Sequence, residues 1–512
     1  MILFIEPISK NIDMYVPAYP LPIMEVASFV KQNRPETEIK IISLPVDFGI
    51  PLTREGKDRI YRKFLRDLAR LKPTGIGISC TAISQAEEVI HLCGLIRALN
   101  ADIFIFLGGY FPTVYYEEIF ARTQTVDLIV IGEGEEPALK IIECLEKGKD
   151  PRNTAIPNLA WQENGQIKLS SKNLRFDLHK KAPINLELLR HPKAYDILPY
   201  AFSRGCPYRC SFCMEEFIRP HRKIVPVDIV RKDLTNLVRQ SQTHRLLISD
   251  ALFKSFDFFP FLRSLGLKIS FETRCDALDP SIIGGMADVC EIMAIGFESA
   301  SYDSLRRMNK VRDRDHYHNY LSNMTAIFKA AVKHEIPMMV FMIAGYPGDT
   351  KTDLEESLAF VKKLSRHRGP GGYVFKIGEC RVYPKTRIFD VARTSSDIQF
   401  DNVGVFEPNI VRQPSKNLGF DTVLSYMRKI FELSHHTHTL NNAFRRIMPF
   451  FRLPTDALMD EMVPEICYRG NDREIINAHG ESLSVFRNRV PELIKKYQPL
   501  MSGQRSTRTL SL

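Results

Sequence analysis

Strand-like apolar runs alternate with amphipathic helical stretches through residues 1–150, and this alternation limits the possible folds more than any other feature of the sequence. The apolar runs cover 2–6, 39–44, 75–79, 103–107 and 128–131, with helical patterns near 22–33, 56–71, 84–99, 113–121 and 135–147. Nearly continuous apolar strands with helices between them are typical of a parallel sheet covered by helices on both faces. We therefore predict an α/β domain here.

Small and polar residues follow three of these predicted strands. Five parallel strands favour the flavodoxin-like, Rossmann-like order, in which ligands bind at the carboxyl ends of the strands. Glycine at such an end lets a ligand approach the backbone closely, although a glycine after a strand also serves simply to make a turn. Three such ends in one sheet favour a ligand site, with these candidate residues: Ser79, Thr81, Gly108, Gly109, Gly132 and Glu133.

Three cysteines, Cys206, Cys210 and Cys213, lie close together in a polar segment after another strand-like run. Thiolates are the natural ligands of iron–sulfur clusters, and three of them leave one iron of a four-iron cubane open. Zinc, with His221 as a fourth ligand, is one alternative, but structural zinc sites usually pair two cysteine knuckles. Three unrelated free cysteines are the other alternative.

Bulk properties narrow the class of protein further. A chain of 512 residues is too long for one ordinary core, so several domains are expected. The net charge of +10 is spread along the chain, which allows a nucleic-acid partner without requiring one. Only three of the ten cysteines cluster, which indicates one metal site in a reducing cytoplasm and no disulfide framework. No apolar stretch is long enough to span a membrane, and residues 1–6 resemble a first strand more than a signal peptide.

The second half of the chain repeats the strand–helix alternation. Strand-like runs at 246–249, 269–272, 292–296, 338–343 and 373–377 predict a β/α barrel with its chemistry at the carboxyl ends of the strands. Candidates at those ends are Asp250, Arg274, Glu298 and Gly345. Before the barrel, residues 151–198 read as a linker with a hairpin at Asn164-Gly165. After it, residues 396–512 read as a helical region with a disordered tail.

Two sets of motifs resemble known families. The Cys-x-x-x-Cys-x-x-Cys segment, with Phe212 before its last cysteine, resembles the signature of radical SAM enzymes. The runs 107–113 and 126–135 resemble the cobalamin-binding domain that precedes many of those enzymes. The resemblance implies a Rossmann-like cobalamin-binding domain over residues 1–150. It also implies a partial (β/α)6 TIM-like radical SAM barrel over residues 199–395.

The resemblance also implies roles for individual residues. Cys206, Cys210 and Cys213 would bind a 4Fe–4S cluster beside Phe212, and S-adenosylmethionine (SAM) would chelate the open iron through its amino and carboxylate groups. Glu298 would hydrogen-bond the ribose of SAM, and the segment at Gly345 would line the adenine. Arg274 would contact the SAM carboxylate or the substrate, with a plain ion pair at the barrel end as the alternative.

The cobalamin-binding segment departs from the family pattern at one point. Members that ligate cobalt from below use an Asp-x-His-x-x-Gly loop, and no such loop follows the first strand. His91 and Gly94 have the right spacing, but Val89 replaces the aspartate and the segment is predicted to lie within a helix. We therefore expect cobalamin without a protein histidine below the cobalt. The alternative is a vestigial domain that binds no cobalamin.

The family reading implies that SAM is cleaved to a 5′-deoxyadenosyl radical, and that the enzyme is a cobalamin-dependent methyltransferase acting on an unactivated carbon. The alternatives are a radical cyclase and a non-catalytic cobalamin or cluster-binding protein. A tRNA methylthiotransferase would need three further cysteines for a second cluster, and Cys80, Cys93 and Cys144 show no such convergence. The expected partners are a small-molecule or natural-product substrate and an electron donor such as flavodoxin or ferredoxin. A nucleic-acid partner is disfavoured, and the expected location is the cytoplasm.

Overall fold

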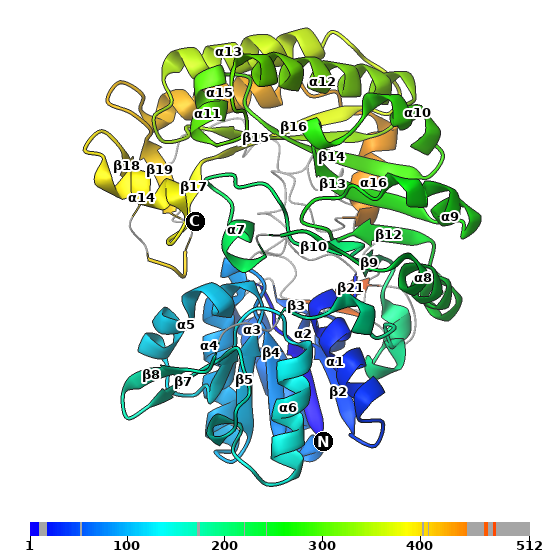
Figure 1. Ribbon diagram of the computed structural model, residues 1–512, viewed down its shortest axis with the longest axis vertical. Helices are drawn as coiled ribbons and strands as arrows, with labels where there is room; N and C mark the ends of the chain where they lie inside the picture. Colours follow the sequence, from blue (N-terminus) through cyan, green and yellow to red (C-terminus); the bar gives the residue numbers. More distant parts are fainter. Residues whose placement is uncertain are drawn as a thin grey trace.

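The protein has two lobes that face each other across the segment carrying the three cysteines (Figure 1). The lower lobe is an α/β domain, drawn in blue and cyan, and the upper lobe is a curved sheet lined with helices, drawn mostly in green. A computed structural model describes residues 1–9, 18–51, 54–171, 175–219, 221–241, 243–401, 404–407, 409–447, 465–468 and 475–477.

The N-terminal sheet has the strand order β2-β1-β4-β5-β6, and these five strands are parallel. This is the flavodoxin-like order predicted from the alternation of strands and helices. Two antiparallel strands, β7 and β8, extend the sheet beyond β6. The strands are β1 (Ile2–Glu6), β2 (Ile39–Ser43), β4 (Gly75–Ser79), β5 (Phe104–Gly108), β6 (Leu128–Val130), β7 (Leu159–Glu163) and β8 (Gln166–Leu169).

Helices cover both faces of this sheet, close to the predicted positions. The helix after β5 begins at Tyr110, three residues before the predicted start, because Gly109 adopts a φ of +107° and turns the chain directly into the helix. The hairpin at Asn164-Gly165 forms as predicted, and it pairs with β6, so the sheet continues past residue 150. The helices are α1 (Leu21–Asn33), α2 (Leu44–Asp47), α3 (Arg54–Leu71), α4 (Ile83–Leu99), α5 (Tyr110–Arg122) and α6 (Glu135–Glu146).

The second lobe is an open barrel of six parallel strands in the order β9-β12-β13-β14-β15-β16. The order follows the chain, as repeated right-handed β/α units require, and it confirms the predicted partial barrel. Its strands are β9 (Leu198–Tyr200), β12 (Arg245–Ile248), β13 (Lys268–Arg274), β14 (Cys290–Glu298), β15 (Met338–Ala344) and β16 (Tyr373–Glu379).

Most helices of this lobe line the outside of the barrel, and the short strands of the described chain form three small separate sheets. The outer helices are α8 (Val227–Ser241), α9 (Phe259–Ser264), α10 (Ile283–Met286), α11 (Tyr302–Arg307), α12 (Arg314–Lys333), α13 (Lys351–Leu364) and α15 (Phe420–Phe431). Two helices lie elsewhere: α14 (Arg387–Thr394) packs on β17 and β18, and α16 (His438–Ile447) packs against the opposite face of the barrel sheet, where Leu440 joins Ile292 and Ala294 of β14. The smaller strands are β3 (Ile50–Pro51), β10 (Ser203–Arg204), β11 (Lys223–Ile224), β17 (Arg381–Val382), β18 (Gln399–Phe400), β19 (Asn409–Gln413), β20 (Glu465–Tyr468) and β21 (Ile475–Asn477).

Residues 396–447 are partly helical, as predicted, but they also supply β18 and β19, and α15 packs against the barrel at β16 and α13. The predicted disordered tail lies outside the described residues. This part of the chain therefore completes the barrel lobe.

One apolar core joins the two lobes. Ile2 and Phe4 point from β1 into the same buried cluster as the barrel residues Phe271 and Met293. The alternate residues of β1, Leu3 and Ile5, point into a second cluster on the other face of the first sheet. The burial of apolar surface on both sides of the domain boundary holds the lobes together.

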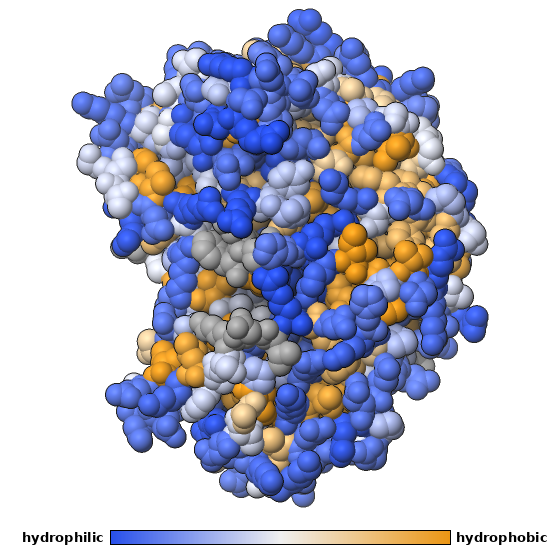
Figure 2. Space-filling view, in the orientation of Figure 1, coloured by the Kyte–Doolittle hydropathy of each residue, from blue (hydrophilic) through white to orange (hydrophobic). Residues whose placement is uncertain are grey.

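The surface is that of a protein with its apolar residues mostly inside. Hydrophilic side chains cover most of the face in Figure 2, and apolar residues form smaller patches over both lobes. Scattered apolar side chains of this kind are normal on protein surfaces. No helix in the described part of the chain is long and apolar enough to cross a membrane.

Candidate active site

The three clustered cysteines lie on a loop between β10 and β11, which pair as a short antiparallel ribbon at its base. Gly205 starts the loop with a φ of +84°, and any Cβ there would collide with the carbonyl oxygen of His221. The glycine is therefore required by both conformation and space. Cys213 donates its N–H to the carbonyl of Cys210 at 3.0 Å, which folds the loop back on itself.

Ser211 fastens this loop to the carboxyl ends of the barrel strands. Its backbone N–H donates to Met308 O at 3.1 Å, and its hydroxyl donates to Arg307 O at 2.7 Å. The same hydroxyl lies 2.8 Å from the hydroxyl of Tyr346, which follows β15. Phe212, next along the chain, packs against the apolar cluster that contains Met308 and Tyr346. The roles of Ser211 and Tyr346 could not be predicted from the sequence, because neither residue belongs to the cysteine spacing.

Burial disfavours the ionised form of two of the three thiols. Burial raises the pKa of Cys213 to about 11, with the neighbouring Cys210 and Cys206 thiols adding to the shift. Burial also raises the pKa of Cys206, so a bound metal centre is needed to keep these sulfurs as thiolates. Nowhere in the described chain are three His, Cys, Asp or Glu side chains close enough to share one metal ion. A cubane does not need that closeness, because each thiolate binds a different iron.

Arg274, at the end of β13, reaches the cysteine loop directly. Its Nη1 donates to the sulfur of Cys210 at 3.0 Å, and its guanidinium lies 3.8 Å from the ring centre of Tyr208. Asp276 accepts two hydrogen bonds from the same group, at 2.8 and 2.7 Å. Burial lowers the pKa of Arg274, but the bonds to Asp276 outweigh it and raise the pKa, so the side chain is a fixed cation beside the loop.

Replacing Arg274 by glutamine is expected to lower the reduction potential of the bound cluster by about 60 mV or more. A charge-assisted hydrogen bond to a thiolate stabilises the more negative, reduced cluster, and it contributes about 1.5 kcal/mol or more. For one electron, each 1.4 kcal/mol corresponds to about 59 mV. An EPR-monitored redox titration measures the shift, with Arg263→Gln on the exposed Asp288 pair as the control. An unchanged potential with weaker SAM binding would instead assign Arg274 to the SAM carboxylate.

Glu298 ends β14 in a strained conformation, with a φ of +68°, where the register with β15 shifts. Its Oε1 accepts a hydrogen bond from the buried Lys310 at 2.8 Å, and Lys310 also donates to Gly296 O at 3.0 Å. Positive φ in a residue other than glycine is stored strain that often marks a functional site. The contact of Glu298 with the ribose of SAM stays a prediction.

Gly345 follows β15 with a φ of +73°, and a Cβ there would lie 3.1 Å from both Pro414 and Val423. The next residue, Tyr346, is the one that contacts Ser211. The chain therefore passes tightly between the barrel end and α15, close to the cysteine loop. The contact of this segment with adenine stays a prediction.

Asp250, which follows β12, holds the start of the cysteine segment. Its carboxylate accepts a hydrogen bond from the N–H of Phe202 at 2.7 Å and another from the hydroxyl of Ser203. Burial raises the pKa of Asp250 to about 6, although these hydrogen bonds oppose the shift. Asp250 therefore fixes the chain at Phe202 and Ser203, just before the cysteine loop.

Asp250→Asn is expected to gain stability relative to the wild type as the pH rises from about 4 to about 6. The folded protein binds the proton of Asp250 more tightly than the unfolded chain does, so the wild type loses stability as the pH rises through the folded pKa. The full difference is up to about 3 kcal/mol. Urea unfolding of both proteins across this range measures it, and a pH-independent difference would contradict the assignment.

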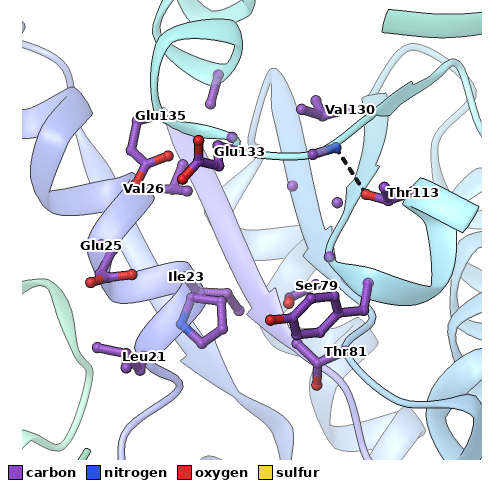
Figure 3. A pocket seen from close by; sticks show the side chains of 18 of the residues that line it. Leu21, Ile23, Glu25, Val26, Ser79, Thr81, Thr113, Val130, Glu133 and Glu135 are labelled. Carbon is purple, nitrogen blue, oxygen red and sulfur yellow. Dashed lines mark hydrogen bonds between the residues drawn. The ribbon is translucent and has the colours of Figure 1, made fainter. Parts of the chain in front are cut away.

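A cavity of about 350 Å³ lies at the carboxyl ends of the N-terminal strands. Figure 3 shows side chains from α1, β4, α5 and the loop after β6 around the cavity. The structure brings all six predicted residues of this region together there. They are Ser79, Thr81, Gly108, Gly109, Gly132 and Glu133.

The cavity floor is suited to a flat, bulky ligand. Within the described part of the chain, a Cβ at Gly108 or Gly132 would meet no atom within 4 Å, so the missing side chains leave open space. Gly109 is tight instead, since its Cβ would lie 2.5 Å from Cys80 O. The loop after β6 is held by a hydrogen bond from Gly132 N–H to Thr113 Oγ1 at 2.9 Å (Figure 3). One buried oxygen at the cavity, Glu25 Oε1, has no hydrogen-bond partner among the described residues, since Lys181 Nζ lies 3.9 Å away, and it can accept an amide N–H of a bound ligand.

No histidine is among the described residues that line the cavity. His91 lies on α4 with its side chain exposed and its ring 5.3 Å from that of Tyr61. It is a helix residue, as predicted from Val89 and its position. The expectation of cobalamin without a protein histidine below the cobalt stays a prediction.

Residues on either side of the three cysteines form the other wall of this cavity. The cavity is lined on this side by residues that face the strand ends of the N-terminal domain: Ala201, Arg204, Ile218 and Arg219. Arg219, just after α7 (Glu215–Ile218), lies 4.9 Å from the ring centre of Tyr110 at the start of α5. This wall could not be predicted from the sequence, because its residues are far along the chain from the strands that they face.

The three cysteines that a second cluster would need lie on different elements. Cys80 follows β4, Cys93 lies on α4 and Cys144 lies on α6 beside Thr154, 3.8 Å away. Burial raises the pKa of Cys93 to about 12, as expected of an inert core thiol. This arrangement gives no support to the methylthiotransferase alternative.

Comparison with known proteins agrees with the geometry. Residues 14–142 match the model of the B12 binding domain, and residues 200–361 match that of the radical SAM superfamily. An uncharacterized methyltransferase of Pyrococcus horikoshii is 25% identical over 387 residues, which are 73% of this chain and 78% of that protein. An anaerobic magnesium-protoporphyrin IX monomethyl ester cyclase of Rubrivivax gelatinosus is 27% identical over 210 residues, 38% of this chain and 36% of the cyclase.

A solved structure shares the whole architecture. The radical S-adenosylmethionine methyltransferase TsrM from Kitasatospora setae, solved with cobalamin and a [4Fe–4S] cluster, superposes with a TM-score of 0.57. The match covers 89% of this chain and 91% of TsrM at 14% identity, so it establishes a common fold. The chain is a radical SAM protein with an N-terminal B12-binding domain. The predicted family, fold class and cofactor set of 4Fe–4S cluster, SAM and cobalamin are confirmed.

Proposed function

We propose that the protein transfers a methyl group from SAM, by way of cobalamin, to an unactivated carbon of a small-molecule substrate. One observation carries this proposal: the cavity at the strand ends of the B12-binding domain is walled on its other side by residues that flank the three cysteines of the barrel. A radical made at the loop and a methyl group held in the cavity would then lie on neighbouring sides of this wall. The bound cofactors supply the radical and the methyl group, and the protein orients them.

The residues divide into two groups. Cys206, Cys210 and Cys213 would hold the cluster, with Arg274 donating to one of its thiolates and Glu298 binding the ribose of SAM. The strand-end residues from Ser79 to Glu133 would hold cobalamin. Arg219 and Tyr110 bridge the lobes at the cavity wall, and this contact would exclude water from the reacting groups.

The remaining partners follow from this chemistry. The cluster needs a one-electron donor, and flavodoxin or ferredoxin is the proposed source. A reduced iron–sulfur site and free thiols suit the cytoplasm, which is the proposed location.

A test that requires no knowledge of the substrate uses SAM labelled with CD3. The full chain, reconstituted anaerobically and supplied with cobalamin under reducing conditions, is expected to form CD3-cobalamin, which mass spectrometry detects. The Gly108→Leu variant, whose cavity would be filled, is the matched control. Protein that binds its cluster and cobalamin but forms no labelled cobalamin would contradict methyl transfer.

Ring formation without methyl transfer is the second candidate, and the similarity to the Rubrivivax cyclase favours it. That reaction would remove hydrogens from the substrate and leave no label in the product. The similarity covers 38% of this chain, whereas the relative that is named a methyltransferase covers 73%. We therefore place methylation first.

A further inference from the structure

A buried arginine at the base of the cysteine loop connects the two cofactor sites. Arg204 lies in β10, two residues before Cys206, and its side chain is only 6% exposed. Its guanidinium points away from its own barrel and into the B12-binding domain. It contacts carboxylates of that domain: Glu25 Oε2 at 2.9 Å, Glu133 Oε1 at 3.2 Å and Glu135 Oε1 at 2.5 Å.

The three carboxylates come from different elements, and all of them line the cavity. Glu25 lies on α1, Glu133 lies in the loop after β6 and Glu135 begins α6. Figure 3 shows their side chains on the same side of the cavity. One planar guanidinium can bond several carboxylates at once, which a lysine ammonium does with less geometric definition.

The second strand of the ribbon makes the same kind of contact. Lys223, which pairs with Arg204 across β10 and β11, places its Nζ 2.7 Å from Glu133 Oε2. Both ends of the cysteine loop are therefore fastened to Glu133 of the cobalamin cavity. Every cysteine of the loop lies between these two cations.

We propose that Arg204 and Lys223 form a clamp that fixes the position of the cluster relative to cobalamin. Arg204 is then a positioning residue: it acts on the cluster through the backbone at Gly205 and Cys206, and on cobalamin through the three glutamates. This inference rests on the proposed function, because it requires both cofactors in one molecule. A fixed separation matters, because errors of about 1 Å in a site of this kind impair its chemistry.

The test measures geometry rather than turnover. Full-length protein is loaded with cob(II)alamin and its reduced cluster, and EPR measures the dipolar interaction between the two paramagnets. The variants are Arg204→Lys, which keeps the charge, and Lys223→Met. Arg222→Gln is the matched control: it lies on the same ribbon, but its guanidinium donates to Ser203 and Ser255 of the barrel lobe, at 3.0 and 3.2 Å.

The wild type and Arg222→Gln are expected to give one narrow cobalt–cluster distance. Arg204→Lys is expected to keep its iron content and to broaden that distribution by about 1 Å or more, and Lys223→Met to broaden it less. The clamp proposal would be overturned if Arg204→Lys and Lys223→Met gave the same distance distribution as the wild type. It would also be overturned if Arg222→Gln broadened that distribution as much as Arg204→Lys does. A wild type that fails to bind cobalamin or a cluster would instead contradict the proposed function.

Discussion

Replacing Cys210 by alanine is expected to remove the iron–sulfur cluster and, with it, all cleavage of SAM. Two cysteines cannot hold a cubane that is already one ligand short, so the iron content should fall from about four per chain to near zero. Iron analysis after anaerobic reconstitution measures the first effect, and formation of 5′-deoxyadenosine measures the second. The fold should remain intact, because Cys210 bonds only to the loop and to Arg274 in the hydrogen bonds described for it.

Cys290→Ala is the matched control for this variant. Cys290 is also buried, but it lies in β14 at the beginning of the strand, away from the cysteine loop. Its loss should cost some stability as a small cavity in the core, while the cluster and SAM cleavage persist. Iron binding in Cys210→Ala at the wild-type level would show that the loop is not the cluster site.

Gly108→Leu is expected to weaken cobalamin binding by about 10- to 100-fold without unfolding the protein. The backbone tolerates the change, because a Cβ there meets no atom of a described residue within 4 Å. The rest of the side chain would occupy the cavity, and forcing a ligand against it costs about 1–3 kcal/mol. Titration with hydroxocobalamin, followed by its visible spectrum, gives the affinity.

Gly94→Leu is the matched control, because it makes the same substitution at a glycine outside the cavity. Gly94 also has open space around its Cβ, but it lies on α4 outside the cavity lining. That variant should bind cobalamin as the wild type does, and both variants should keep the cluster. Equal cobalamin affinity in Gly108→Leu and wild type would mean that the cofactor does not occupy this cavity.

Local sequence patterns were sufficient to predict the strand order, the ligand-site residues at the strand ends and the cysteine loop. The strand order followed from the alternation of apolar runs and helices, since short connections leave few topologies for a parallel sheet. The residues from Ser79 to Glu133 could be predicted as one group because the carboxyl ends of parallel strands meet at one edge. The cysteine loop was recognisable because its ligands are close together in the chain.

The contacts between the two lobes could not be predicted in the same way. Arg204 and Glu25 are 179 positions apart, and nothing in the local pattern of either residue indicates the other. The sequence allowed three partners for Arg274, namely SAM, the substrate and an ion pair. The structure shows the Cys210 sulfur as a further partner. Such pairs depend on how two finished domains pack, so they are properties of the tertiary structure.

The most direct test of the central claim is the mass of the product. Reconstituted full-length protein, with cobalamin, a reductant and CD3-labelled SAM, is incubated with a small-molecule extract of cells that lack its gene. We expect a compound that gains one CD3 group in place of a hydrogen, together with 5′-deoxyadenosine. The Cys210→Ala variant should form neither of these products. Formation of 5′-deoxyadenosine with a product that has lost hydrogens and carries no label would contradict methylation.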